Sequence, residues 1–292
     1  MNSDTAMAQS RENVRNMHCS NISHFNNISC ILFKFIEITG VGLIVRATIH
    51  QPYFIPWLGY FSKLAFSDTF IVLDNVNFRK RHYFDRTRIV NMHGEIRWLS
   101  LPVGQNFKRK CYEVKVVQPN KLYVDKIIRT IEFSYAKAKF YDYEWLKLRN
   151  VLRKPLYKYL NLVDVNISII TNILEYLNIK MPDIHFASKL IEDCKDPTER
   201  IIQICKSLKI DSVIVGGGMS LEVHNFQRVK KNGINVSIQD YLVNHPIYEQ
   251  SRRKKAGFQK GLTILDAILN IGRSRTKEFL IDERYKPVSL IP

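Results

Sequence analysis

Three residues able to move a proton follow short apolar runs in this sequence. His50 comes after the mostly β-branched segment 45–49, Asp74 after the apolar segment 69–73, and Asp240 after an alternating segment. Histidine has an ordinary pKa of about 6.5, so it can accept a proton near neutral pH, and a nearby carboxylate can orient its ring. We therefore predict that His50 is a general base, with Asp74 or Asp240 as its catalytic partner. The alternatives are a structural histidine bonded to the backbone, a helix or turn cap for Asp74, and an ordinary polar surface residue for Asp240.

Amides, guanidinium groups and glycines near the same positions can hold a polar ligand. Paired arginines in a loop suit the forked recognition of phosphate or carboxylate. Glycines after a strand let the backbone approach a phosphate closely, although a tight turn explains them equally well. A second titratable cluster follows Asp240. The residues predicted to bind substrate are Gln51, Asn75, Arg86, Arg88, Gly216, Gly217, Gly218, His245 and Tyr248.

A strand, a loop, a helix and a second strand are predicted to position the first of these residues. A His-Gln-Pro sequence stops segment 45–49, segment 60–66 has apolar residues at helical spacing, and segment 69–73 is short enough for a buried parallel strand. Ligands gather at the carboxyl ends of the strands in open α/β sheets. We expect His50 and Asp74 to face one crevice, provided that their strands are neighbours.

A second α/β unit is predicted further along the chain. Its elements are helix 198–208, strand 212–215, a glycine turn, helix 220–231 and strand 234–238. This order predicts an α/β fold of Rossmann-like type, with a mostly parallel sheet flanked by helices. The glycine turn and Asp240 would then share the crevice with His50.

The middle of the chain predicts helices and core, not chemistry. Apolar residues at steps of three and four form one helical face, made of Leu162, Val165, Ile169, Ile173, Tyr176 and Leu177. We interpret residues 45–292 as a single α/β domain with a helical insert at about 120–190. Residues 1–44 are interpreted as a leader that is disordered or additional to the native protein.

The composition is that of a globular protein with a large core, since 46% of the 292 residues are hydrophobic and 24% are charged. The five cysteines form no C-x-x-C pair, so neither a zinc ribbon nor a disulfide framework is supported, and we expect a cytoplasmic location. Charged residues interrupt the apolar stretch 29–49, so no membrane span is expected. No ligand spacing is diagnostic of a metal, and no cofactor is predicted.

The net charge of +17, from 44 basic and 27 acidic residues, indicates an anionic partner. The basic clusters are scattered at 79–88, 108–110, 228–231 and 252–255. A solvated surface explains most of these charges equally well. No helix-turn-helix, zinc finger or RNA-binding aromatic motif is present, which disfavours a nucleic-acid-binding protein.

Several longer motifs characterise the chain between residues 45 and 272. They are IHQPYFIPWLGYF, FIVLDNVNF, an R-x-R pair, WLSLPV, TERIIQICKSLKIDSVIVGGG, GINVSIQDY, HPIY and LTILDAILNIG. In these segments the chain resembles the WbqC-like family of bacterial proteins. It departs from the family pattern at Asp85, where relatives tend to have an amide before the paired arginines, and at Gly216, where the glycine segment lacks a Ser-Gly start.

The resemblance implies a role in the biosynthesis of O-antigen and other surface glycans. It implies transfer of an acyl or aminoacyl group, such as glycyl, to the amine of a nucleotide-linked amino sugar. The donor would be an aminoacyl-tRNA or another activated acyl compound, and we expect Arg86 and Arg88 on the diphosphate. A non-catalytic ligand-binding or assembly protein of a glycan pathway is the alternative. The strand–loop–helix opening also faintly resembles that of nucleotidyl-transferring Rossmann-like enzymes. The corresponding loop lacks the second histidine of their H-x-G-H motif, which argues against a straightforward adenylating enzyme.

Overall fold

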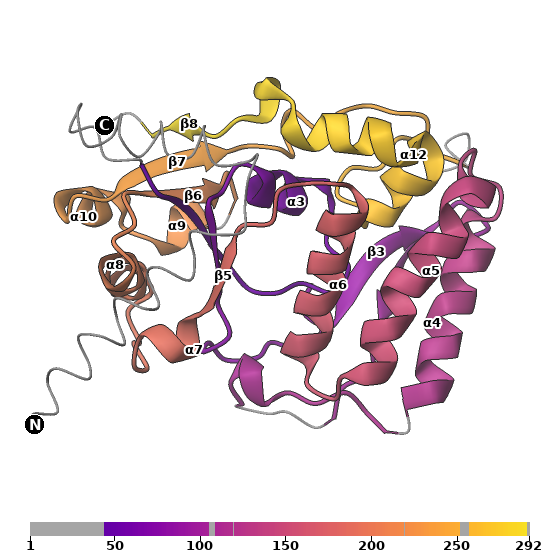
Figure 1. Ribbon diagram of the computed structural model, residues 1–292, viewed down its shortest axis with the longest axis horizontal. Helices are drawn as coiled ribbons and strands as arrows, with labels where there is room; N and C mark the ends of the chain where they lie inside the picture. Colours follow the sequence, from indigo (N-terminus) through magenta and orange to yellow (C-terminus); the bar gives the residue numbers. More distant parts are fainter. Residues whose placement is uncertain (1–43, 105–108, 119, 219, 252–256, 291–292) are drawn as a thin grey trace, which may run out of the picture. The chain divides into compact units, whose positions relative to one another are not determined.

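Six strands form one sheet in the computed structural model of this chain, which describes residues 44–104, 109–118, 120–218, 220–251 and 257–290. The order across the sheet is β5-β2-β1-β6-β7-β8 (Figure 1). The strands are β1 (Arg46–His50), β2 (Thr69–Val72), β5 (Asp183–Phe186), β6 (Ser212–Gly216), β7 (Asn235–Gln239) and β8 (Val288–Ser289). All neighbours pair in parallel except β7 and β8. The leader predicted for residues 1–44 lies, apart from Ile44, outside the described residues.

The strand order reverses between β1 and β6, and this reversal makes a crevice. From β1 the chain continues to β2 and β5 on one side, whereas β6 and β7 follow on the other side. The ends of β1 and β6 are therefore a topological switch point, where open α/β sheets bind their ligands. The predicted Rossmann-like α/β fold is confirmed, and His50 is the last residue of β1.

Helices cover both faces of the sheet, which explains why the central strands are almost wholly apolar. Along β2, Phe70 and Val72 belong to the hydrophobic core that includes α3 (Leu58–Ala65) and α12 (Ile264–Ile281), whereas Ile71 belongs to the second core, which includes α8 (Pro197–Ser207) and α10 (Phe226–Lys231). Successive side chains of a strand point to opposite faces, so one strand serves both layers.

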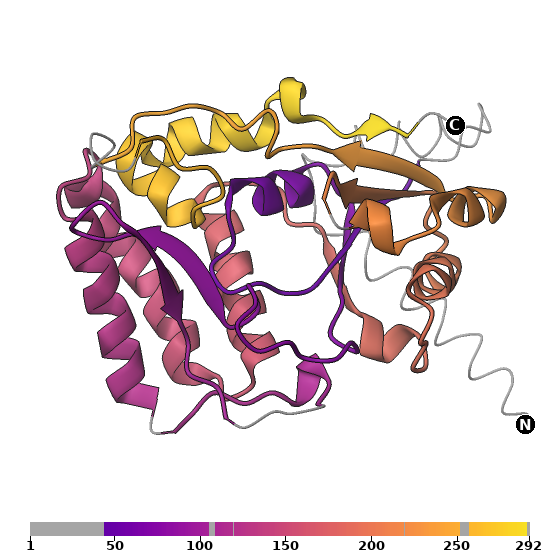
Figure 2. The ribbon, with the colours of Figure 1, turned by 180° about the vertical axis from the view of Figure 1, so that it is seen from behind.

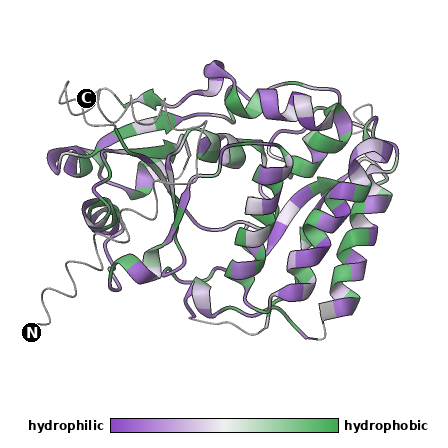
Figure 3. Ribbon diagram, in the orientation of Figure 1, coloured by the Kyte–Doolittle hydropathy of each residue, from purple (hydrophilic) through white to green (hydrophobic). Residues whose placement is uncertain are grey.

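Three longer helices form the middle segment beside the sheet (Figures 1 and 3). They are α4 (Asn120–Tyr135), α5 (Tyr141–Lys158) and α6 (Leu162–Tyr176). The Asn161 side chain caps α6 by accepting the backbone N–H of Val163 at 2.8 Å. The predicted apolar face of α6 is largely buried in the core. Strand β5 and the short helix α7 (Ala187–Leu190) follow, and the sequence did not indicate this strand.

The paired arginines lie in a strand and not, as predicted, in a loop. Strand β3 (Arg86–Val90) pairs with β4 (Ile96–Ser100) in an antiparallel hairpin, which Figure 2 shows beside α12 and the middle helices. In β3, Thr87 and Ile89 are buried, whereas Arg86 and Arg88 are half-buried on the other face. This alternation of polar and apolar residues is the signal of a half-buried strand.

The predicted helix 220–231 is interrupted. It consists of α9 (Ser220–Val223) and α10, because the Asn225 side chain accepts the backbone N–H of Arg228 at 3.0 Å and starts a new helix. Two single turns are also present, η1 (Cys111–Glu113) and η2 (Glu283–Tyr285). None of the helices within the described ranges is long and apolar enough to cross a membrane.

Candidate functional site

A cavity of about 640 Å³ lies at the carboxyl ends of β1, β6 and β7. We call it the switch-point cavity. Its lining includes His50, Lys63, His82, Arg88, Gly216 to Gly218 and Asp240. These residues come from both halves of the sheet and from the β3–β4 hairpin, so the fold assembles a site from segments far apart in the sequence.

His50 is held in one orientation by the backbone of Gln51 and by two tyrosine rings. Its Nδ1 lies 2.9 Å from the carbonyl oxygen of Gln51, and edge-on contacts place the rings of Tyr53 and Tyr60 at 4.6 and 4.8 Å. A carbonyl oxygen can only accept, so Nδ1 carries the proton and Nε2 carries the lone pair, which accepts no hydrogen bond from any residue of the described ranges. The imidazole is thus arranged to accept a proton at Nε2.

The pKa of His50 lies well below its ordinary value, so the ring is neutral at neutral pH. Burial is the largest cause, and the nearby ammonium group of Lys63 adds to it. The hydrogen bond to Gln51 acts in the opposite direction. A neutral histidine is the form that a general base requires.

Gln51 acts on His50 through its backbone and not through its amide. Its carbonyl oxygen also accepts the Tyr60 hydroxyl at 3.0 Å. The Gln51 side chain does not line the switch-point cavity, so the predicted contact between this amide and a substrate has no support in the geometry.

The glycine segment and Asp240 close the cavity on the side of β6 and β7. A Cβ atom on Gly217 would lie 2.8 Å from the carboxyl carbon of Asp240, so the close approach requires glycine here. Gly216 and Gly218 have open space at the corresponding position. Asp240 is exposed, and its carboxylate accepts the backbone N–H of Val243 at 3.4 Å.

The two predicted arginines have different surroundings. Arg88 lines the switch-point cavity and donates to the carbonyl oxygen of Lys260 at 3.5 Å. Arg86 stacks on the ring of Trp98, with 3.9 Å between the guanidinium carbon and the ring centroid. Arg86 does not line the cavity, although its charge helps to lower the pKa of His82. Of these two arginines, only Arg88 borders the space where a ligand would bind.

The cavity also contains residues that the sequence did not single out. Lys63 is buried there, and burial lowers its pKa to about 8. Arg200, His82 and His224 line the cavity too, and each has a buried ring or guanidinium nitrogen without a partner among the described residues. The pKa values of both histidines are lowered, chiefly by burial and then by arginine charges. A lysine within the mostly apolar segment 60–66 was the one available signal.

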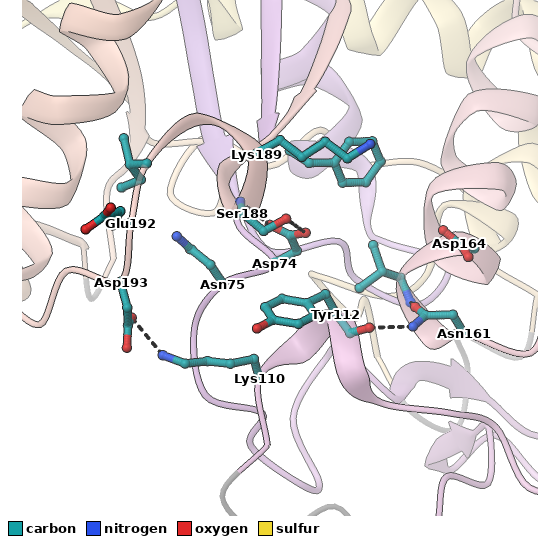
Figure 4. Close-up of a pocket in the computed structure, with 13 residues that line it drawn as sticks. Asp74, Asn75, Lys110, Tyr112, Asn161, Asp164, Ser188, Lys189, Glu192 and Asp193 are labelled. Atoms are coloured by element: carbon teal, nitrogen blue, oxygen red, sulfur yellow. Dashed lines mark hydrogen bonds and ion pairs between the residues drawn. The ribbon is translucent and has the colours of Figure 1, made fainter.

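Asp74 does not meet His50, which corrects the prediction that the two share a crevice. The strands are neighbours, with His50 opposite Val72, and Leu73 lines the switch-point cavity. The next residue, Asp74, lines a different cavity of about 620 Å³, which we call the Asp74 cavity (Figure 4). Its two carboxylate oxygens accept the backbone N–H and the hydroxyl of Ser188, at 2.9 and 2.6 Å.

Asn75 lines the Asp74 cavity as well, and not the cavity of His50. Its side chain is buried, and neither amide atom has a partner among the described residues. Across the cavity, Lys110 forms an ion pair with Asp193 at 2.8 Å (Figure 4). Asp74 and Asn75 therefore belong to a separate polar cavity.

His245 and Tyr248 are buried structural residues and do not line the switch-point cavity. The His245 ring lies 2.9 Å from the Pro246 carbonyl oxygen through Nδ1, and its Nε2 accepts the backbone N–H of Gly261 at 3.4 Å. The Tyr248 hydroxyl donates to Asp266 at 2.7 Å. Their polar atoms are committed to the fold, so the predicted contact with substrate has no support in the geometry.

No group of three or more histidine, cysteine, aspartate or glutamate side chains is arranged to hold a metal ion within the part of the chain that the structure describes. What the switch-point cavity offers is a neutral histidine with a free Nε2, a glycine-rich backbone, and three basic side chains against one carboxylate. This combination suits proton transfer next to an anionic ligand.

Comparison with known proteins agrees with the motifs in the sequence. The profile of the WbqC-like protein family matches residues 51–278. The chain is also similar to the uncharacterized protein Rv1507c of Mycobacterium tuberculosis, with 26% identity over 234 residues that cover 78% of this chain and 94% of the relative. No solved structure matches the sequence significantly.

Proposed function

This chain belongs to the WbqC-like protein family, and we propose that it is an enzyme of surface-glycan (O-antigen) biosynthesis that transfers an acyl or aminoacyl group, such as glycyl, to the amine of a nucleotide-linked amino sugar. The observation that carries the proposal is the state of His50. It is a neutral imidazole with its Nδ1 proton fixed by Gln51, in a cavity at the switch point of the sheet.

The chemistry requires one proton acceptor, and His50 is suited to be it. The amine nitrogen of the sugar attacks the carbonyl carbon of the acyl donor and forms a C–N bond. As this bond forms, the nitrogen loses a proton to Nε2 of His50. The leaving group departs with the electron pair of its bond to the acyl carbon and receives that proton, so His50 returns to its neutral form.

The remaining lining residues suit a nucleotide-linked sugar. The backbone at Gly216 to Gly218 can approach a diphosphate closely, and Arg88 can form forked hydrogen bonds to it. The rings of Tyr53, Trp57 and Tyr83 offer flat apolar surface to a base or a sugar. Asp240 is the carboxylate available in this cavity, and we assign it a role in binding the amine.

We propose an activated acyl compound, such as an aminoacyl-tRNA, as the donor. The net charge of +17 supports a large anionic donor of this kind. A cytoplasmic location is supported by the free cysteines Cys111, Cys194 and Cys205.

A transfer assay tests the proposal. The purified protein is incubated with nucleotide-linked amino sugars and a labelled aminoacyl-tRNA or acyl thioester, and the sugar product is identified by mass spectrometry. We expect one amino sugar to gain an amide-linked group, whereas the corresponding plain sugar does not react. Absence of product with every donor class contradicts the transferase proposal.

A ligand-binding or assembly protein of a glycan pathway is the second candidate. It is favoured by one observation: among the described residues, no carboxylate forms a hydrogen bond with His50, as would be usual for a catalytic histidine. Tight binding of a nucleotide sugar with no turnover would favour this candidate.

A further inference from the structure

Lys63 is a buried lysine that the proposed reaction does not use. It lies in α3, between Ser62 and Leu64, which are both fully buried. Only 8% of its surface is exposed, and the side chain lines the switch-point cavity. Lysines are rarely so buried without a partner, since taking an ammonium group out of water is costly.

No opposite charge compensates Lys63 within the described ranges. It forms no ion pair there, although ten ion pairs are found elsewhere in these ranges. Its pKa is lowered to about 8 by burial, with no contribution from a carboxylate. The amine is therefore still mostly protonated at neutral pH and carries an unpaired charge into the cavity.

The charge of Lys63 lowers the pKa of His50, and this effect requires the ammonium group to lie near that histidine. The other charged side chains that line the cavity are Arg88, Arg200 and the exposed Asp240. Three positive charges thus face one negative charge, while the histidines are kept neutral by their lowered pKa values. An anionic ligand would supply the missing charge.

We propose that Lys63 binds an anionic group of the ligand, a phosphate or a carboxylate, and thereby holds that group beside His50 in the switch-point cavity. This inference rests on the proposed function in taking that cavity as the ligand site. It adds a second anion-binding position to the one assigned to Arg88. The compact, strongly hydrated ammonium group suits a phosphate or carboxylate oxygen approached from one direction.

Titration calorimetry at neutral pH tests the inference with simple anions. Inorganic pyrophosphate and orthophosphate form one arm, and acetate and glycine form the other, so that the two sources of negative charge are distinguished. We expect one arm to bind the wild type, and Lys63→Met to weaken that binding about tenfold or more, because a hydrogen bond to a charged group is lost. Lys63→Arg is expected to retain part of the affinity.

The matched control is Lys189→Met, the same chemical change at an exposed lysine of the Asp74 cavity. This variant should bind the anion as the wild type does. A role of Lys63 in the fold alone predicts that Lys63→Met lowers the melting temperature. We expect the reverse, a raised melting temperature with weaker anion binding, because the substitution removes an unpaired buried charge.

Two results overturn the inference: unchanged anion affinity in Lys63→Met, or no binding of any of the four anions to the wild type. Failure of the proposed function is a separate outcome. If anions bind through Lys63 but no amino sugar is acylated, the anion site stands and the transferase proposal falls.

Discussion

Both carboxylate oxygens of Asp74 accept hydrogen bonds from Ser188, one from its backbone N–H and the other from its hydroxyl. Asp74 follows the strand next to that of His50, yet it belongs to a different cavity. The carboxylate therefore caps the start of α7 and joins it to the end of β2, a structural role.

Asp74→Asn should consequently destabilise the protein without changing its chemistry. The amide of the variant keeps an acceptor oxygen for the Ser188 N–H, but both hydrogen bonds lose the charge of the carboxylate, which should lower the free energy of unfolding by about 1–3 kcal/mol. The kcat/KM of transfer should stay within about twofold of the wild type. Chemical denaturation and steady-state kinetics measure the two effects. A drop in kcat/KM of the size expected for His50 would return Asp74 to the catalytic group.

His50→Gln should abolish most of the transfer activity. Loss of a general base costs typically about 10²- to 10⁴-fold in rate. The pKa of His50 is lowered by burial and by Lys63, so the ring loses its base function only when pH falls below the ordinary value of about 6.5. The acid limb of kcat/KM should therefore lie below that pH in the wild type and be absent in the variant.

The control for His50→Gln is His93→Gln, the same change at an exposed residue of the β3–β4 hairpin. It should leave both rate and pH profile unchanged. An unchanged acid limb in His50→Gln would show that another group accepts the proton.

The four central strands of the sheet and half of the site could be predicted because their signals are local. Short β-branched runs followed by proline or glycine marked β1 and β6, and both ends meet in the switch-point cavity. The separation of Asp74 from His50 was not predictable in the same way. It depends on β5 and α7, which bring Ser188 to Asp74, and the half-exposed edge strand β5 has no apolar run to reveal it.

The second reason why the predicted site differs from the observed one is that the sequence does not show which cavity a side chain faces. Leu73 and Asp74 are consecutive and follow the end of β2, yet they line different cavities. Lys63 was missed because helical spacing does not say which side of α3 meets a cavity. His245 and Tyr248 have the residue types of a site, but their hydrogen bonds are internal.

Gly272→Ala should destabilise the protein strongly. Gly272 interrupts α12 with φ 78° and ψ 162°, a region that is almost exclusive to glycine and costs other residues about 1–3 kcal/mol. A Cβ atom would also lie 2.9 Å from the ring of Phe140. Urea unfolding measures the loss.

The matched control is Gly233→Ala, where φ is +79° but no atom lies within 4 Å of the added Cβ. It measures the cost of a positive φ where the added Cβ meets no neighbouring atom. We expect Gly272→Ala to lose more stability than Gly233→Ala, and equal losses would contradict an extra cost from the extended ψ and the Phe140 ring at Gly272.

Asp266 should make stability depend on pH. Burial raises its pKa from 3.8 to about 6, although hydrogen bonds from Tyr248 and Gln250 oppose this shift. The folded protein thus binds the proton more tightly than the unfolded chain, so the contribution is full below about pH 4 and is lost as pH rises through about 6. The difference in pKa corresponds to about 3 kcal/mol.

Comparison with Asp266→Asn isolates this contribution from that of the histidines. Between pH 4 and 7, the free energy of unfolding of the wild type should fall relative to that of the variant by up to about 3 kcal/mol. Parallel curves for the two proteins would show that Asp266 does not titrate differently in the folded state.

The central claim is that the switch-point cavity binds a nucleotide-linked amino sugar, and ligand-induced thermal stabilisation tests it most directly. The ligands compared are nucleotide-linked amino sugars, plain nucleotide sugars and free nucleotides. Each is measured with the wild type and with Arg88→Met. An amino-sugar nucleotide at 100 times its dissociation constant should add about 2.7 kcal/mol to the stability of the wild type. We predict a selective shift with one amino-sugar nucleotide, reduced in Arg88→Met. Equal shifts with plain sugars, or no shift with any nucleotide sugar, would contradict the account.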